Sequence, residues 1–203
     1  MNTLILARHA HAVSNAGDTV NAVPPGGGLS AAGVEEACAL GRLLASEAID
    51  LGVSSRLLRT QQTLALALGD SVIPVAIEPF LDEIGFGSFE GGPLVAYRTW
   101  AWEHDPDAAC PGKGESRASA AARFADGLIA LLGRPQETIL AVSHALPLRY
   151  VLDASDGSFP AARVVPVPHA TPYRLERASI ELAAETLRAW AASPRFSDTP
   201  FCG

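Results

Sequence analysis

The sequence predicts an α/β fold, a three-layer α/β/α sandwich with a mainly parallel sheet. Two apolar runs, residues 3–8 and 138–143, are short and unbroken, as is typical of strands covered on both faces. Around them, segments with helical spacing of apolar residues alternate with further short apolar runs. This alternation favours parallel strands lying side by side, with helices packed on both faces of the sheet.

In the first half of the chain, each element follows from a local pattern. Residues 11–28 end in two prolines and three glycines, which predicts a loop that carries ligand contacts. Ser30 is a good N-cap type, and apolar residues share one face of the helix expected after it. Residues 80–92 are rich in turn formers. The predicted elements are a strand at 3–8, a helix at 31–47, a strand at 50–54, a helix at 57–68, a strand at 72–77 and a helix at 94–103.

The second half repeats the alternation of strands and helices. A loop rich in proline and glycine at 105–114 precedes Ser116, which is expected to begin a helix that ends near Leu132. The last helix has an apolar stripe and an acidic face, which predicts a solvated outer helix. After the helix that ends near Leu132, the predicted elements are strand 138–143, helix 146–153, strands 163–167 and 172–176, and helix 178–192.

Composition limits the class of protein. A chain of 203 residues with 48% hydrophobic residues suits one domain, 1–203, with a sizeable core. Its net charge of −7 argues against nucleic acid or an acidic membrane as a partner. Cys38, Cys110 and Cys202 are too far apart for a metal motif or a disulfide framework. Because the first apolar run soon meets Arg8 and no run is long enough to span a bilayer, we expect a cytoplasmic protein.

Basic side chains follow both of the fully apolar strands. Arg8 and His9 come at the end of the run 3–8, and Ser143 and His144 come at the end of the run 138–143. In open α/β sheets, ligands bind beyond the carboxyl ends of the strands. Arginine offers a planar fork for phosphate or carboxylate, and histidine serves as a nucleophile or proton carrier near neutral pH. The two strand ends therefore predict an active site that handles an anion.

Six blocks of residues along the chain carry a resemblance to a known family. The first block is Arg8-His9-Ala10, with Asn15 seven residues after Arg8. The other five are Leu29-Ser30-Ala31-Ala32-Gly33, the run SSRLLRTQQT from Ser54 to Thr63, Leu81-Asp82-Glu83 with Gly87-Ser88-Phe89-Glu90-Gly91, Gly114-Glu115-Ser116, and Val142-Ser143-His144-Ala145. In this order, and spread over residues 3–176, they resemble the histidine phosphatase superfamily in its phosphoglycerate mutase-like branch. Ala10 and Ala145 stand where that family usually has glycine, so we expect strain if either needs a positive φ.

The resemblance implies a phosphoglycerate mutase-like fold and a covalent route for phosphoryl transfer. His9 corresponds to the nucleophile, which would form a phosphohistidine while a backbone carbonyl holds its other ring nitrogen. Glu83 corresponds to the general acid for the leaving alcohol and then the general base for water, so its pKa should lie above the usual value for a glutamate. Asp82 and Glu90 are the alternatives for this role.

The remaining matched residues would bind the phosphate. Arg8 and Arg59 would hold its oxygens bidentately, Asn15 would add a neutral donor, and His144 would donate as an imidazolium. Because two arginines and two histidines supply the positive charge, no metal and no cofactor are expected.

Several residues near these blocks allow two interpretations. His11 either touches substrate or is merely exposed, while His104 and His169 are expected on the surface or in loops. Tyr97, Trp100 and Trp102 form either a substrate wall or, as we favour, a packed surface.

The favoured function is a metal-independent phosphomonoester hydrolase acting on a small phosphorylated metabolite. A phosphoglycerate mutase is an alternative, but mutases of this family resemble each other in a longer, more basic insertion, whereas residues 84–114 contain only Arg98 and Lys113 as cations. A non-catalytic phospho-ligand binder is a third, weaker hypothesis. Loops 16–28 and 85–114 are expected to face the substrate, and their few cations argue against a highly anionic one. The sequence leaves the oligomeric state open, and the resemblance implies a homodimer as one option.

Overall fold

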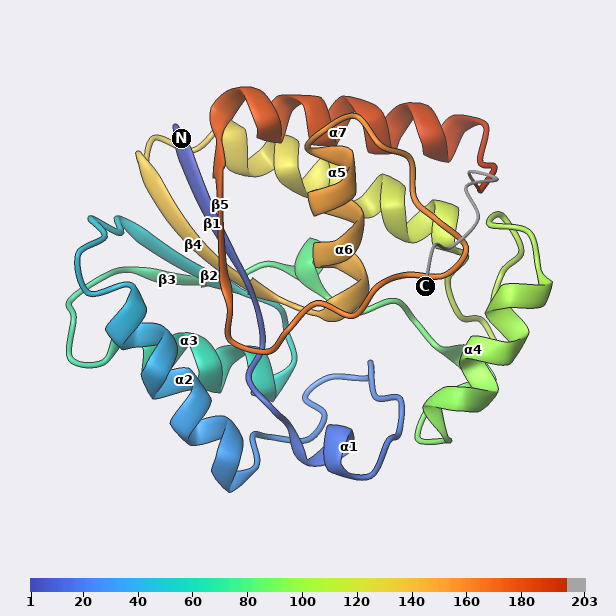
Figure 1. Cartoon of the computed structure of the whole chain (residues 1–203), viewed down its shortest axis with the longest axis horizontal. Coiled ribbons are helices and arrows are strands. Elements are labelled where there is room, and N and C mark those ends of the chain that lie inside the picture. Colours follow the sequence, from blue (N-terminus) through green and yellow to red (C-terminus); the bar gives the residue numbers. More distant parts are fainter. Residues whose placement is uncertain (197–203) are drawn as a thin grey trace.

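A computed structural model of the chain describes residues 1–196, whose five strands form one sheet (Figure 1). The strand order is β3-β2-β4-β1-β5. The first four strands in this order are parallel, and β5 runs antiparallel to β1 at one edge. The strands are β1 (Thr3–Arg8), β2 (Leu51–Ser54), β3 (Val75–Ile77), β4 (Thr138–Ser143) and β5 (Pro172–Glu176). The mainly parallel sheet is therefore confirmed.

Helices cover both faces of this sheet, which confirms the predicted three layers. In Figure 1, α2 and α3 lie together on one side, and α5, α6 and α7 lie on the other. The helices are α1 (Val13–Ala16), α2 (Ala31–Leu43), α3 (Leu58–Leu68), α4 (Leu94–Glu103), α5 (Arg117–Leu132), α6 (Ala145–Ala154) and α7 (Arg177–Ala192), with single 3₁₀ turns at Pro79–Leu81 and Gly87–Phe89.

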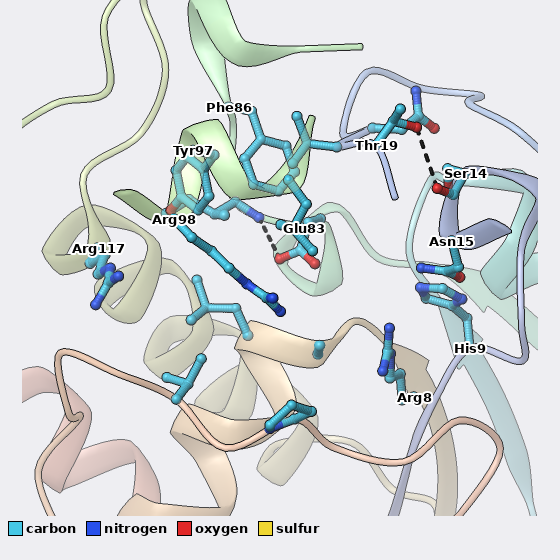
Figure 2. A pocket seen from close by; sticks show the side chains of 18 of the residues that line it. Arg8, His9, Ser14, Asn15, Thr19, Glu83, Phe86, Tyr97, Arg98 and Arg117 are labelled. Carbon is cyan, nitrogen blue, oxygen red and sulfur yellow. Dashed lines mark hydrogen bonds between the residues drawn. The ribbon is translucent and has the colours of Figure 1, made fainter. Parts of the chain in front are cut away.

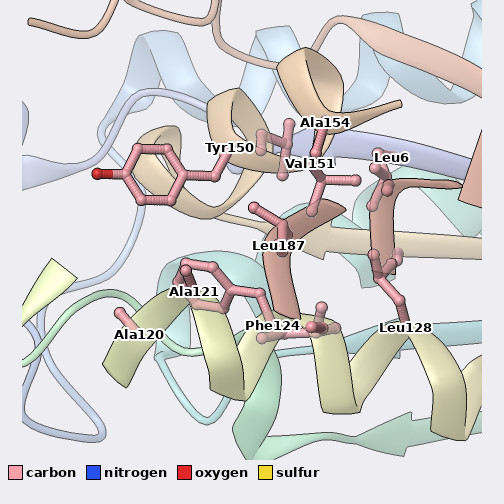
Figure 3. Packing of buried hydrophobic residues seen from close by; sticks show 14 of the residues in the cluster. Leu6, Ala120, Ala121, Phe124, Leu128, Tyr150, Val151, Ala154 and Leu187 are labelled. Atoms are coloured by element: carbon pink, nitrogen blue, oxygen red, sulfur yellow. The ribbon is translucent and has the colours of Figure 1, made fainter. Parts of the chain in front are cut away.

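The central strands are apolar throughout because each of them contributes to two cores. In β1, Leu4 and Leu6 belong to the core under α5, α6 and α7, whereas Ile5 and Ala7 belong to the core under α2 and α3. Successive side chains of a strand point to opposite faces, so a strand between two helical layers needs apolar residues at every position. Figure 3 shows Leu6 in the first core, near Phe124 of α5 and Leu187 of α7.

The carboxyl ends of three strands meet at one edge of the sheet. Arg8 is paired with Ser143, and Ser54 is paired with Val142, so β1, β2 and β4 end at the same level. The residues that follow these strands therefore lie next to one another although they are far apart in sequence. This is the edge at which open parallel sheets bind their ligands.

The predicted strand at 163–167 is wrong, because this segment has no strand partner. Arginine side chains bond its carbonyl oxygens instead. Arg117 Nη1 donates to the carbonyl of Ala162 (2.6 Å), Arg149 Nε to that of Val165 (3.0 Å), and Arg8 Nη1 to that of Val167 (2.8 Å). These bonds stabilise an extended segment beside the sheet edge.

Other predicted boundaries shift by a few residues. The helix expected at 31–47 ends at Leu43, although Ser30 does cap it, accepting a hydrogen bond from the Gly33 amide at 3.1 Å. The strand expected at 72–77 is shortened to Val75–Ile77. Helix α7 is amphipathic as predicted, but its inner face is fully buried at Leu187 and nearly so at Trp190. Among residues 1–196, no helix has the length and hydrophobicity needed to cross a bilayer. Cys202 lies outside the described residues.

Leu187→Ala tests whether α7 contributes to the stability of the main core. Because Leu187 is fully buried, the substitution leaves a cavity, and we expect the free energy of unfolding to fall by about 2–5 kcal/mol. Leu182→Ala on the same helix is the matched control, since Leu182 is 40% exposed and should cost about 0.5 kcal/mol or less. Urea denaturation measures both free energies of unfolding. Equal decreases in the two variants would contradict the packing of Leu187 in the main core.

Candidate active site

A cavity of about 380 Å³ opens at the carboxyl ends of the strands (Figure 2). Its volume lies in the range of small-molecule sites. The wall is built from segments far apart in sequence: the end of β1, the loop after it, the start of α3, residues 83–86, helix α4, the start of α5 and α6, and residues 163–166. Both predicted substrate-facing loops, 16–28 and 85–114, contribute lining residues.

His9, the predicted nucleophile, is held in a single tautomer by its two neighbours. Its Nδ1 lies 2.8 Å from the carbonyl oxygen of Ala10, which can only accept a hydrogen bond, so Nδ1 carries the proton. Arg59 Nε, which can only donate, lies 3.1 Å from Nε2, so Nε2 keeps its lone pair. Burial lowers the pKa of His9 well below its usual range, and the charges of Arg59 and Arg8 lower it further.

His144 is neutral as well in the free protein, and the imidazolium expected with bound phosphate stays a prediction. Burial lowers the pKa of His144 well below its usual range, and the Arg59 charge adds to this effect. Its Nδ1 accepts a hydrogen bond from Arg59 Nη2 (3.1 Å), which leaves Nε2 to donate to Ser55 Oγ (2.8 Å). The rings of His9 and His144 lie 5.2 Å apart between centroids.

Arg59 joins the two histidines and is itself held by the loop 16–28. It lies in the first turn of α3 and is 4% exposed. Its Nη2 donates to the carbonyl oxygen of Asn21 (2.8 Å), and the Asn21 amide donates to Glu90 (3.1 Å). Glu90 also accepts from the backbone amide of Ala22 (2.9 Å). Glu90 is therefore a structural carboxylate, which supports Arg59 through the Asn21 side chain.

Arg8 and Asn15 also lie on the cavity wall beside His9 (Figure 2). The Asn15 side-chain oxygen accepts from the Ala12 amide (2.9 Å), which leaves its NH₂ group to donate elsewhere. Burial lowers the pKa of Arg8, which remains a cation at any physiological pH. In residues 1–196, positive φ at non-glycine positions occurs at Asp18, Lys113 and Ala170, so the alanines at 10 and 145 are unstrained.

Glu83 is the carboxylate of the cavity, and Asp82 is not. The Glu83 side chain accepts from the Ile84 amide (3.0 Å) and lines the cavity. Burial raises the pKa of Glu83, although the Ile84 amide and the nearby arginines oppose this shift. Asp82 forms an ion pair with Arg56 at 2.6 Å. The two adjacent acids thus point to different partners.

Three residues near the cavity escaped prediction. His169 lies in a loop, as expected, but its Nδ1 also donates to the carbonyl oxygen of His9 (2.8 Å), a contact that no sequence pattern indicates. Arg117 and Arg163 line the cavity together with Arg98, so counting cations in the loops alone underestimates its positive charge. No periodic pattern in the sequence marks these residues. The pairing of β5 with β1 and the course of residues 155–171 position His169 and Arg163, and the start of α5 positions Arg117.

The structure distinguishes between the two interpretations of the aromatic residues and of His11. Tyr97 and Trp102 line the cavity, whereas Trp100 stacks on the exposed His104 ring at 4.6 Å. His11 does not line the cavity, and its Nδ1 lies 2.9 Å from Ser30 Oγ. The Gly33 of the same block must be glycine, since a Cβ there would come within 1.9 Å of the His11 carbonyl oxygen.

Comparison with known proteins places this arrangement in a family. Residues 4–190 match the family described as the histidine phosphatase superfamily (branch 1). The chain belongs to this family. Over 128 residues it is 35% identical to the adenosylcobalamin/alpha-ribazole phosphatase of Escherichia coli (strain K12), an alignment that covers 57% of this chain and 61% of that protein. The chain thus spans less than two thirds of this curated relative.

Solved structures agree with this family assignment. The alpha-ribazole phosphatase from Shigella flexneri is 29% identical, with a TM-score of 0.73 over 86% of this chain and 90% of that one. Bacillus stearothermophilus YhfR has a TM-score of 0.76 over 87% of this chain and 91% of its own, and at 22% identity it supports the fold alone. The predicted phosphoglycerate mutase-like α/β fold of this member of the histidine phosphatase superfamily is therefore confirmed.

The tautomer of His9 can be measured directly. Because a carbonyl oxygen faces Nδ1 and a guanidinium faces Nε2, the ¹⁵N spectrum of the free protein at neutral pH should show a protonated Nδ1 and an unprotonated Nε2 for His9. His9→Gln identifies the resonance. The opposite tautomer, or an imidazolium at neutral pH, would show that Arg59 does not face Nε2 in solution.

Proposed function

We propose that this protein is a metal-independent phosphomonoester hydrolase that acts on a small phosphorylated metabolite through a phosphohistidine at His9. The observation that carries the proposal is the unprotonated Nε2 of His9, which lies beside Arg59 in a cavity that also holds Glu83. Neutral imidazole nitrogen is the nucleophilic form, and the low pKa of His9 keeps it so.

In the first step, Nε2 of His9 attacks the phosphorus in line with the leaving oxygen. The P–N bond forms as the P–O bond of the ester breaks, and the protonated carboxyl of Glu83 gives its proton to the leaving alcohol. The carbonyl of Ala10 keeps its hydrogen bond from the Nδ1–H group and so stabilises the positive charge that develops on the ring.

Four side chains would bind the non-bridging oxygens during this step. Arg8 and Arg59 supply charged donors, and Asn15 supplies a neutral NH₂ group. His144 Nδ1 lies 3.1 Å from Arg59 Nη2 and would donate to the phosphate once the ring is protonated. The incoming dianion opposes the effect of the arginines on His144, so its pKa should rise on binding and allow the imidazolium form there. Fixed donors of this kind are usually the largest contribution to catalysis.

In the second step, water replaces the alcohol. The Glu83 carboxylate, now deprotonated, takes a proton from the water as its oxygen attacks the phosphorus. The P–N bond breaks, inorganic phosphate leaves, and His9 returns to its neutral tautomer. A raised pKa suits both roles of Glu83, because the carboxyl holds its proton in the first step and is a stronger base in the second.

Hydrolysis is favoured over a mutase reaction by the relatives, whose names describe phosphatases. Alpha-ribazole phosphate, the compound in those names, therefore belongs in the substrate panel. All matched catalytic positions are filled: His9, Arg59 and Glu83 line one cavity, and the buried His144 bonds Arg59 beside it, which argues against a non-catalytic binder. The loops 16–28 and 85–114 of a single domain, 1–203, would recognise the alcohol part of the ester.

Further sequence-based predictions concern partners and location. A cytoplasmic location fits the free thiols of Cys38 and Cys110, and cell fractionation tests it. A homodimer and the absence of nucleic-acid binding stay predictions, for which sedimentation and electrophoretic mobility shift are the measurements. Among residues 1–196, His, Cys, Asp and Glu form no group of three that could hold a metal ion.

His9→Ala with and without EDTA tests the chemistry. Phosphate release by the wild type should survive EDTA, because arginines rather than a metal stabilise the transferred group. His9→Ala should lose about 10³-fold or more of the turnover, since it removes the nucleophile. His104→Ala, which changes an exposed histidine outside the cavity, should retain wild-type turnover. Inhibition by EDTA, or turnover retained in His9→Ala, would contradict the mechanism.

Glu83→Gln separates proton donation from phosphate binding. We expect turnover of alkyl phosphates to fall by about 10²–10⁴-fold, because an alkoxide is a poor leaving group without a proton. Turnover of 4-nitrophenyl phosphate should fall far less, since its leaving group needs no proton. The decline of wild-type kcat at rising pH, as Glu83 loses its proton, should disappear in the variant. Glu103→Gln on exposed α4 is the matched control, and equal losses for both esters would reject Glu83 as the acid.

A further inference from the structure

The cavity holds more positive charge than one phosphate needs. Among residues 1–196, seven arginines form ion pairs with carboxylates: Arg56, Arg123, Arg134, Arg149, Arg174, Arg177 and Arg188. Five arginines outside that set line the one cavity: Arg8, Arg59, Arg98, Arg117 and Arg163. Glu83 is the one acidic residue in the described wall. In a chain with a net charge of −7, this concentration of unpaired cations indicates an anionic ligand.

Two polar side chains in the cavity wall are buried without a partner for one of their donors. Arg117 and Tyr97 are each 7% exposed. Within the described residues, Arg117 Nε and the Tyr97 hydroxyl make no hydrogen bond. Burial raises the pKa of Tyr97, so its hydroxyl keeps its proton and remains a donor. Unpartnered buried donors are costly, and a ligand that accepts from them would relieve that cost.

These two donors lie at the opposite end of the cavity from His9. In Figure 2, Arg8 and His9 are on one side, and Tyr97 and Arg117 are on the other, with the Tyr97 hydroxyl directed toward Arg117. The exposed Arg98 extends between the two ends. Arg163 stacks on Trp102, with its guanidinium carbon 4.8 Å from the ring centroid. The space between the ends has apolar walls, including Phe86, Leu94 and Leu146.

We propose that the distal end of the cavity, formed by Tyr97, Arg98 and Arg117, binds a second anionic group carried by the alcohol part of the substrate. The inference rests on the proposed phosphatase activity and specifies its substrate class: a phosphomonoester with an apolar spacer and a terminal carboxylate or phosphoryl group. Arg8 and Arg59 bind the phosphate that is transferred, and the distal arginines bind the anion that stays with the alcohol.

An anion fits this end better than a neutral polar group. A hydroxyl or amide would satisfy the Tyr97 and Arg117 donors but would leave the charges of Arg98 and Arg117 without a counter-charge. Guanidinium groups bind carboxylate and phosphate with charge-assisted, bidentate hydrogen bonds, which are about twice as strong as neutral ones. The distal end therefore selects for charge as well as for shape.

The test compares alkyl phosphates with ω-carboxyalkyl phosphates of the same, increasing chain length. The readout is the ratio of kcat/KM for the charged ester to that for the neutral ester. In the wild type we expect this ratio to reach about tenfold or more at the chain length that spans the cavity. An ω-phosphonoalkyl series decides whether carboxylate or phosphoryl is preferred.

Variants at the distal end test whether its arginines cause the preference for the charged ester. Arg98→Met and Arg117→Met should each bring the ratio toward one, because methionine retains much of the apolar stem but no charge. Arg117 also bonds the Ala162 carbonyl, so its loss could disturb the cavity in general, whereas Arg98 has no hydrogen bond within the described residues. Arg42→Met is the matched control: this exposed arginine of α2 lies outside the cavity, and its loss should leave the ratio unchanged.

The outcomes separate the two proposals. Hydrolysis of all esters with a ratio near one at every length and for both terminal groups would overturn the distal anion site but not the phosphatase. A ratio that survives in both Arg98→Met and Arg117→Met would also overturn it. If no ester is hydrolysed, calorimetric affinities of the same ester pairs for the wild type give the ratio without turnover, and tighter binding of the charged ester that depends on Arg98 would support the site.

Discussion

The parallel pairing of β1 with β4 is the constraint on which the rest of the site depends. Their register sets Arg8 opposite Ser143, so His9 and His144 leave neighbouring strands at the same level. Arg59 can then reach both rings from α3, at 3.1 Å from each. The two cores hold this register in place, because a slip by one residue would move Leu4 and Leu6 to the wrong face.

Burial and positive charge act in the same direction on the two histidines. Each is taken out of water, and each faces Arg59, so both effects lower its pKa. For Glu83 the two effects are opposed, since burial raises its pKa and the arginines lower it. The surroundings thus shift the histidines toward the neutral form and Glu83 toward the protonated form, the directions that the proposed nucleophilic attack with proton donation requires.

Arginine serves two purposes in this chain. Arg8, Arg117 and Arg149 bond backbone carbonyls of residues 162–167 and hold that segment along the cavity edge. Arg8 and Arg117 also present their remaining donors to the cavity. The planar guanidinium allows this because its five donors point in fixed, different directions. Structural support and the proposed ligand binding therefore depend on the same side chains.

Local patterns in the sequence were enough to predict most of the architecture. Unbroken apolar strands, Ser30 and Ser116 as helix caps, and helical spacing determined the layers and nearly all elements, because these features act over a few residues. The strand-end residues Arg8, His9 and His144 were also recognisable, since parallel strands present their carboxyl ends together and the surrounding blocks resemble a family.

Tertiary structure decided what depends on distant partners. The segment 163–167 has strand-like residues, but arginine side chains satisfy its carbonyls, so it is not a strand. No local pattern marks His169 or Arg117: the pairing of β5 with β1 brings His169 to the carbonyl of His9, and the start of α5 carries Arg117 into the cavity wall. Protonation was likewise undetermined, because the charge state of His144 follows from burial and from Arg59, neither of which a sequence displays.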